Sequence, residues 1–186
     1  QVHSGDVKIY ENLNVLPRVS IVHQSEIVPN EAQVIAAMKH PDFDPAETLV
    51  RLPRNGEQPG RISRGQVSPL DSATIVLYRP ERVEITARLA SPGWLLLTDA
   101  YYPGWQASIN RQPVEIMLAN GLFRAVPVPA GEHTVLFEYR PASFRWGVVI
   151  TVTALVGLVL GLLVLLKKGH TVDRRQFRLH LYDNRQ

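Results

Sequence analysis

The segment WGVVITVTALVGLVLGLLVLL, from Trp146 to Leu166, contains no charged residue. A helical residue rises about 1.5 Å, so a segment of this length can cross the roughly 30 Å hydrocarbon core of a bilayer. The segment is apolar on every helical face, whereas a helix on the core of a soluble domain is amphipathic. Its C-terminal position argues against a signal peptide. We therefore predict a transmembrane helix over residues 146–166.

The flanks of this segment carry the residues that are typical of a membrane interface. Aromatic and basic side chains sit well at headgroup depth because their apolar parts face lipid and their polar ends face water. The residues predicted to lie at the two interfaces are Phe144, Arg145, Trp146, Lys167 and Lys168.

The distribution of charge predicts the orientation of the chain. Residues 167–186 hold six Lys or Arg and two Asp, a net charge of +4, while the whole chain carries +3. Basic residues beside a span remain on the cytoplasmic side. We therefore expect a cytoplasmic tail at 167–186 and an extracytoplasmic domain at 1–145, joined by a single pass through the cell membrane. The basic charge fits topology and anionic lipid rather than nucleic acid. Within the tail, the alternation of Phe177, Leu179 and Leu181 fits either an interfacial segment or a short strand.

Small residues recur on one face of the predicted span. Gly157 and Gly161 form a G-x-x-x-G pair, and Ala154 adds another small position. This spacing allows a second helix to approach closely, and it predicts packing against other transmembrane helices. Glycine is also common in spans that have no such partner, so both interpretations remain open.

The extracytoplasmic part has the pattern of an antiparallel β-sandwich. Residues 82–89 alternate apolar and polar side chains, residues 94–98 are mainly apolar, and Asn120-Gly121 is a strong hairpin signal. Residues 114–118 are predicted to form one strand, and residues 53–66, rich in Pro, Gly and Arg, an exposed loop. Asn30 is predicted to cap a short helix that ends before Pro41. The domain is large enough to fold without disulfides, and the chain contains no cysteine.

One turn combines an acid with several aromatic residues. Asp99, Tyr101, Tyr102 and Trp105 fit glycan binding, because a sugar can pack on an aromatic ring while its hydroxyl groups reach a carboxylate. The same residues also fit a structural corner in which Trp105 and one tyrosine close the end of the sandwich. The histidines are scattered and show no spacing typical of a metal site or a nucleophile, so we predict neither a metal nor a cofactor.

Several ordered stretches resemble the C-terminal region of the YfhO-like bacterial membrane proteins. They are Tyr101-Tyr102-Pro103-Gly104-Trp105, Phe123-Arg124-Ala125-Val126, Val128 to Val135 and Phe137 to Pro141, with Tyr10-Glu11-Asn12 and Leu16-Pro17-Arg18 upstream. One departure is Asn110-Arg111-Gln112, where we expect a longer turn than in the family.

The resemblance implies a larger polytopic protein with a glycosyltransferase C-like membrane core that acts in cell-envelope glycosylation. This chain would supply the last span and a non-catalytic extracytoplasmic domain that positions the acceptor, and it would contact membrane lipids, other spans and a glycan or lipid-linked sugar. No catalytic residue carries over, because no position matches one. The alternative is a single-span structural subunit of a multi-protein membrane complex.

Overall fold

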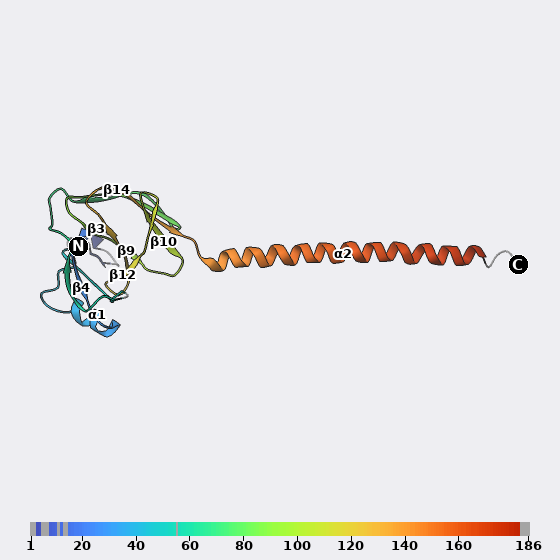
Figure 1. Ribbon diagram of the computed structural model, residues 1–186, viewed down its shortest axis with the longest axis horizontal. Helices are drawn as coiled ribbons and strands as arrows, with labels where there is room; N and C mark the ends of the chain where they lie inside the picture. The colour runs from blue at the N-terminus through green and yellow to red at the C-terminus, as the bar shows by residue number, and fades with distance from the viewer. Residues whose placement is uncertain (1–2, 5–7, 11, 13–14, 55, 183–186) are drawn as a thin grey trace. The chain divides into compact units, whose positions relative to one another are not determined.

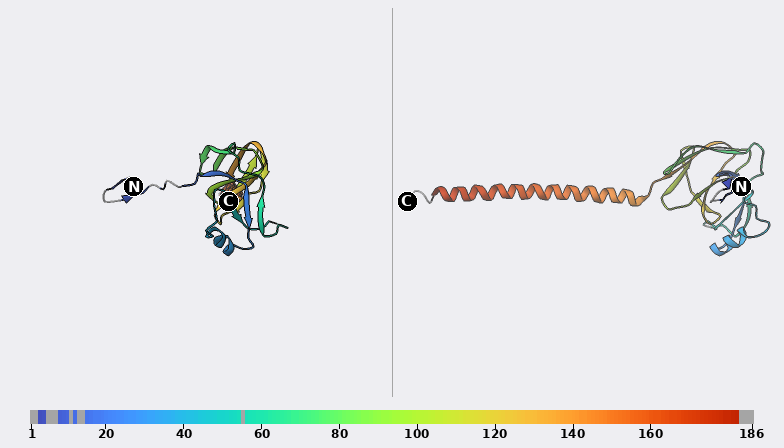
Figure 2. Two further views of the ribbon diagram at one scale, coloured as in Figure 1. Left: turned by 90° about the vertical axis from the view of Figure 1, so that its left-hand side faces the viewer. Right: turned by 180° about the vertical axis from the view of Figure 1, so that it is seen from behind.

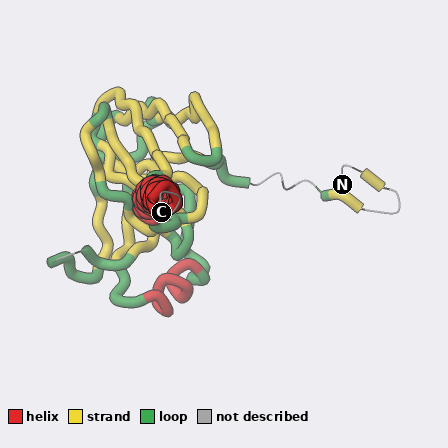
Figure 3. Tube along the Cα trace, turned by 90° about the vertical axis from the view of Figure 1, so that its right-hand side faces the viewer, coloured by secondary structure: helices red, strands yellow, loops and turns green. Residues whose placement is uncertain are grey.

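The computed structural model describes residues 3–4, 8–10, 12, 15–54 and 56–182. The chain divides into two compact units, residues 1–140 and 141–186. The first unit consists mainly of strands, shown as arrows in Figure 1 and in yellow in Figure 3. The second unit consists of one long helix.

Two sheets build the first unit, which Figure 2 shows from two further directions. The five-stranded sheet has the order β11-β10-β14-β8-β7 and is antiparallel. Its strands are β11 (Gln112–Val114), β10 (Trp105–Ile109), β14 (Gly131–Tyr139), β8 (Arg82–Leu89) and β7 (Ser72–Arg79).

The seven-stranded sheet has the order β3-β9-β13-β12-β5-β4-β6, in which only the β4–β5 pair is parallel. Its strands are β3 (Val19–Val22), β9 (Gly93–Ala100), β13 (Phe123–Val128), β12 (Met117–Ala119), β5 (Thr48–Arg51), β4 (Gln24–Ile27) and β6 (Gly60–Ser63). A separate pair joins β1 (His3–Ser4) to β2 (Lys8–Ile9).

The core lies between the two sheets. Ile85 and Phe137 come from the five-stranded sheet, Leu95 and Val126 come from the seven-stranded sheet, and all four belong to one buried apolar cluster. This arrangement follows from the alternation along strands such as β8, where every second residue points inward. The predicted antiparallel sandwich is confirmed, with the β4–β5 pair as a local exception.

The short helix α1 (Glu31–Met38) begins where the sequence predicts. The Asn30 side chain accepts a hydrogen bond from the Gln33 N–H at 3.0 Å, which satisfies one of the free donors of the first turn. The buried face of α1 carries Val34, which packs with Val28 and Val50 in a separate small cluster.

Two predictions about local structure are wrong. Residues 114–118 do not form one strand, because Val114 ends β11 in one sheet and Met117 begins β12 in the other. This mainly apolar run therefore crosses between the two layers. Its four apolar residues are buried or half-buried, while Glu115 is exposed. Part of the predicted loop at 53–66 is the edge strand β6, which pairs with β4 although all its residues are exposed.

An ion pair anchors the segment that links β5 to β6. Arg51 is buried, with its side chain 4% exposed, and its Nη2 donates to Glu57 Oε1 at 2.9 Å. The Nε of Arg51 donates to Ser25 Oγ at 3.1 Å. Hydrogen bonding from Arg51 lowers the pKa of Glu57 to about 2 against the opposing effect of burial, and the backbone N–H of Arg54 adds to the lowering.

The expected longer turn at Asn110-Arg111-Gln112 is also wrong. Ile109 pairs directly with Gln112, so only Asn110 and Arg111 lie in the turn. Their φ angles are +50° and +70°, the left-handed conformation that a two-residue hairpin of this type requires. Arg111 adopts this conformation without the freedom of glycine, which normally occupies this place.

The helix α2 (Ala142–Tyr182) forms the second unit. Its segment Ala142–Lys167 is long and apolar enough to cross a membrane, with a mean hydropathy of 2.9. The helical backbone continues to Tyr182, so the short strand that the tail alternation allowed does not form.

Candidate functional site

The predicted turn lies at one end of the sandwich and joins its two sheets. Asp99 is near the end of β9, and Trp105 begins β10. Ala100 pairs with Phe123 in the seven-stranded sheet, while Trp105 pairs with Tyr139 in the five-stranded sheet. The turn therefore brings residues of both layers together.

Asp99 already has several partners within the protein. Its carboxylate accepts a hydrogen bond from Arg124 Nη2 at 2.9 Å and another from the Tyr78 hydroxyl at 3.3 Å. Arg18 Nε lies 3.5 Å from the second carboxylate oxygen. The Asp99 side chain is only 12% exposed, so the protein covers most of its surface.

Arg124 is the buried centre of this cluster. Its side chain is 3% exposed, and its guanidinium carbon lies 3.9 Å from the centre of the Trp105 ring and 5.5 Å from that of Phe137. Among the described residues, its Nε and Nη1 atoms have no hydrogen-bond partner. Burial lowers the pKa of Arg124 from its ordinary value, and the Asp99 carboxylate opposes this effect. Asp99 and the aromatic faces are therefore the groups that stabilise this charge.

A β-bulge in β7 brings Tyr78 into the cluster. The register with β8 shifts between Ile75 and Leu77, so that Tyr78 faces Val83, a buried residue. An extra residue reverses the face on which the following side chains lie. Arg18 then lies over the Tyr78 ring at 4.7 Å, which completes a chain of contacts from Tyr78 to Trp105.

Beside Trp105 lies an open hollow of about 600 Å³. Tyr101 and Trp105 supply its aromatic surface, and the Trp105 ring lies 5.5 Å from that of Tyr139. The polar groups of the hollow are Gln106, Ser108, Glu115, Glu138 and Arg140. We call this surface the Trp105 hollow.

The charged groups of the Trp105 hollow form ion pairs within the protein. Arg140 Nη2 lies 2.9 Å from Glu138 Oε2, and Arg82 Nη1 lies 3.4 Å from the other oxygen of Glu138. Glu115 forms an ion pair with Arg54. The hollow therefore presents paired carboxylates beside aromatic rings.

The four predicted glycan-binding residues thus have different surroundings. Tyr101 and Trp105 line the hollow, and Asp99 belongs to the Arg124 cluster. Tyr102 does not line the hollow and is 63% exposed. Glycan binding by these residues stays a prediction. The sequence did not reveal that Glu138 on β14 and Glu115 in the β11–β12 link lie beside Trp105, because this proximity depends on sheet pairing rather than on a local pattern.

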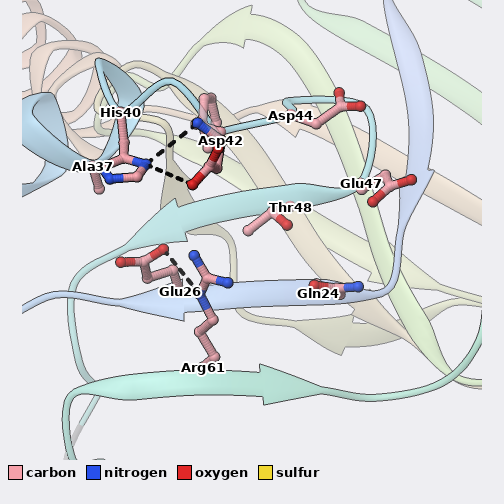
Figure 4. Close-up of a pocket in the computed structure, with 10 residues that line it drawn as sticks. Gln24, Glu26, Ala37, His40, Asp42, Asp44, Glu47, Thr48 and Arg61 are labelled. Carbon is pink, nitrogen blue, oxygen red and sulfur yellow. Dashed lines mark hydrogen bonds and ion pairs between the residues drawn. The ribbon is translucent and has the colours of Figure 1, made fainter.

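A second hollow, of about 340 Å³, lies beside α1 and is shown in Figure 4. Two of its four acidic residues lie close to basic side chains: Glu26 lies 3.5 Å from Arg61, and Asp42 lies 3.6 Å from His40. Among the described residues, no group of His, Cys, Asp and Glu is arranged to hold a metal ion.

His23 forms a buried link at the start of β9, the end of that strand away from the Asp99–Trp105 turn. Its two ring nitrogens lie 2.9 Å from Asp71 Oδ2 and 2.9 Å from the Pro92 carbonyl oxygen. Burial opposes ionisation of Asp71, but hydrogen bonds from the Ala90 N–H, from His23 and from the Ser68 N–H outweigh it and lower its pKa. This arrangement ties the loop before β7 to β3 and β9, which suits a structural histidine.

The residues predicted to act in the membrane lie on α2. Phe144 and Trp146 are 71% and 66% exposed, and Arg145 lies between them. A methyl group added at Gly157 or Gly161 would meet no other atom within 4 Å, so the face that also carries Ala154 is open within the described part of the chain. Packing by this face stays a prediction. Lys167 ends the candidate span, and the side chain of Lys168 lies outside the described residues.

The fold and the apolar helix together define a membrane protein that carries a β-sandwich domain. Residues 70–151 match the sequence profile of the family described as Bacterial membrane protein YfhO. This match runs from β7 into α2 and includes the Asp99–Trp105 turn and Arg124, which confirms the resemblance predicted from the sequence. Neither a curated protein nor a solved structure shows a significant match to the chain.

Proposed function

We propose that the sandwich is an extracytoplasmic, sugar-binding accessory domain, and that the Trp105 hollow holds part of a glycan during cell-envelope glycosylation. In this account α2 is the last span of the protein, and the transfer chemistry takes place outside residues 1–186. The observation that carries the proposal is the combination of Tyr101 and Trp105 with two carboxylates in one hollow.

The chemistry of the hollow suits a sugar. The C–H face of a pyranose packs on an aromatic ring, and its hydroxyl groups can donate to Glu115 and Glu138 or accept from Arg140. A volume of about 600 Å³ lies in the range of small-molecule sites, which is about 300–1,000 Å³. Because Arg82 and Arg140 hold the half-buried Glu138 before the ligand arrives, little of its side-chain entropy is lost on binding.

The test is calorimetric titration of the full chain in lipid nanodiscs with neutral fragments of bacterial envelope glycans. We expect Gln106→Ala and Glu115→Gln to weaken binding, because both residues line the hollow and neither belongs to the buried core. Glu132→Gln is the matched control, because this exposed glutamate near the start of β14 does not line the hollow. Binding that is equally strong in all three variants would contradict the proposal.

A second candidate is a structural subunit that docks through its span. The spacing of Gly157 and Gly161 favours it, because small residues four positions apart lie on one helix face and permit close helix contact. Stoichiometric co-purification with unrelated subunits, together with no glycan binding, would favour this function over the first.

A further inference from the structure

A small aromatic and apolar surface lies at the end of the sandwich that holds the Asp99–Trp105 turn. The Tyr101 N–H donates to the Leu122 carbonyl oxygen at 2.6 Å, so the β9–β10 turn and the β12–β13 hairpin lie side by side. Tyr102 is 63% exposed, Leu122 is 53% exposed and Tyr101 is 38% exposed. We call these three residues the tyrosine patch.

The backbone ties this patch closely to the start of α2. The Arg140 N–H donates to the Gly104 carbonyl oxygen at 2.8 Å, and α2 begins at Ala142. Only Pro141 separates these residues, and two chain steps span at most about 7 Å.

The length of the candidate span sets the depth of Ala142. The segment Ala142–Lys167 has 26 residues, which at about 1.5 Å each reach about 39 Å. The hydrocarbon core is about 30 Å thick, so the ends of this segment reach the headgroup region. Phe144 and Trp146, both exposed, are aromatic residues of the kind found at this depth.

We propose that the tyrosine patch contacts the lipid headgroups of the leaflet in which α2 begins. Tyrosine suits this place because its ring is apolar and its hydroxyl is polar, and the exposed Leu122 adds apolar area. The nearby basic groups are paired, Arg140 with Glu138 and Arg18 with Asp99. The contact therefore depends on aromatic and apolar area rather than on lipid charge.

The test uses the absence of cysteine from the chain, so that one introduced cysteine gives one labelled site. Tyr102→Cys and Leu122→Cys are each labelled with an environment-sensitive fluorophore in nanodiscs of phosphatidylcholine, and lipid with a spin label near the headgroup acts as quencher. Ala130→Cys is the matched control. Ala130 is exposed and precedes β14, whose nine residues span about 30 Å.

We expect strong loss of fluorescence at positions 102 and 122 and little loss at position 130, with the same pattern when anionic lipid replaces part of the phosphatidylcholine. Near-ultraviolet circular dichroism of each variant identifies any that has not folded. If one of the two patch variants has not folded, the result for the other one tests the proposal. Absence of quenching at the folded patch positions, equal quenching at position 130, or quenching that requires anionic lipid would each overturn the proposal. None of these results depends on sugar binding.

Discussion

Replacing Asp99 with asparagine distinguishes a structural cluster from a sugar-binding acid. Asp99→Asn keeps the shape of the side chain but removes the negative charge that faces Arg124 at 2.9 Å. Arg124 would then keep a positive charge at 3% exposure, with Nε and Nη1 still lacking hydrogen-bond partners among the described residues.

The expected cost follows from this burial. Breaking a buried ion pair by removing one partner costs about 3–5 kcal/mol, because a charge is left without compensation. Stacking of Arg124 on Trp105 remains and offsets about 1 kcal/mol. We therefore expect a loss of about 3 kcal/mol in the free energy of unfolding, which in a domain of this size lowers the Tm by roughly 10 °C.

The assay is thermal and urea unfolding of the full chain in nanodiscs, followed by near-ultraviolet circular dichroism. The double variant Asp99→Asn with Arg124→Met is the control, and we expect it to recover much of the loss because no unpaired charge remains in the core. A change in the single variant below about 0.5 kcal/mol, together with loss of glycan binding, would refute the structural role and make Asp99 a ligand contact.

Three further predictions concern other parts of the chain. The pKa of Glu57 is lowered from 4.5 to about 2, mainly by its bond to Arg51. The ion pair therefore contributes fully to the free energy of unfolding above pH 4.5, and this contribution disappears as the pH falls toward 2. With the side chain 31% exposed, we expect a loss of about 1–2 kcal/mol in acid urea titrations, and Glu57→Gln should lack this acid step. Arg111→Gly should raise the free energy of unfolding by up to about 1 kcal/mol, because φ is +70°; a lower Tm would contradict this reason. Gly157→Ile combined with Gly161→Ile should reduce cross-linking between α2 and neighbouring spans, and unchanged cross-linking would show that this face has no partner.

Local patterns in the sequence predicted much of the fold. Alternation along residues 82–89, the Asn30 cap and the Asn120-Gly121 hairpin each depend on residues close in sequence, and each is present in the structure. The edge strand β6 has no such signal, because both its faces are exposed and its side chains need no alternation. In the run at 114–118 four of the five residues are apolar and Glu115 is the exception, a pattern that also fits one strand, so it could not show that the chain changes sheets there.

The site was harder to predict because its contacts are long-range. The acid and aromatic residues of the turn were visible, but nothing near Arg124 in the sequence shows that its charge is buried against Asp99 and Trp105. The position of Tyr78 depends on a bulge, and a single extra residue leaves little trace in an apolar run. Glu115 and Glu138 approach Trp105 only because β11, β10 and β14 are neighbours in one sheet.

The most direct test of the sugar-binding account is a nuclear magnetic resonance titration of the full chain with its indole nitrogens labelled. The chain has three tryptophans, so Trp94 in the core, Trp105 at the hollow and Trp146 on α2 give separate signals. The account predicts that an envelope glycan fragment shifts the Trp105 signal in a saturable way and leaves the other two in place. A Trp105 signal that does not move, or equal movement of all three signals, would contradict it.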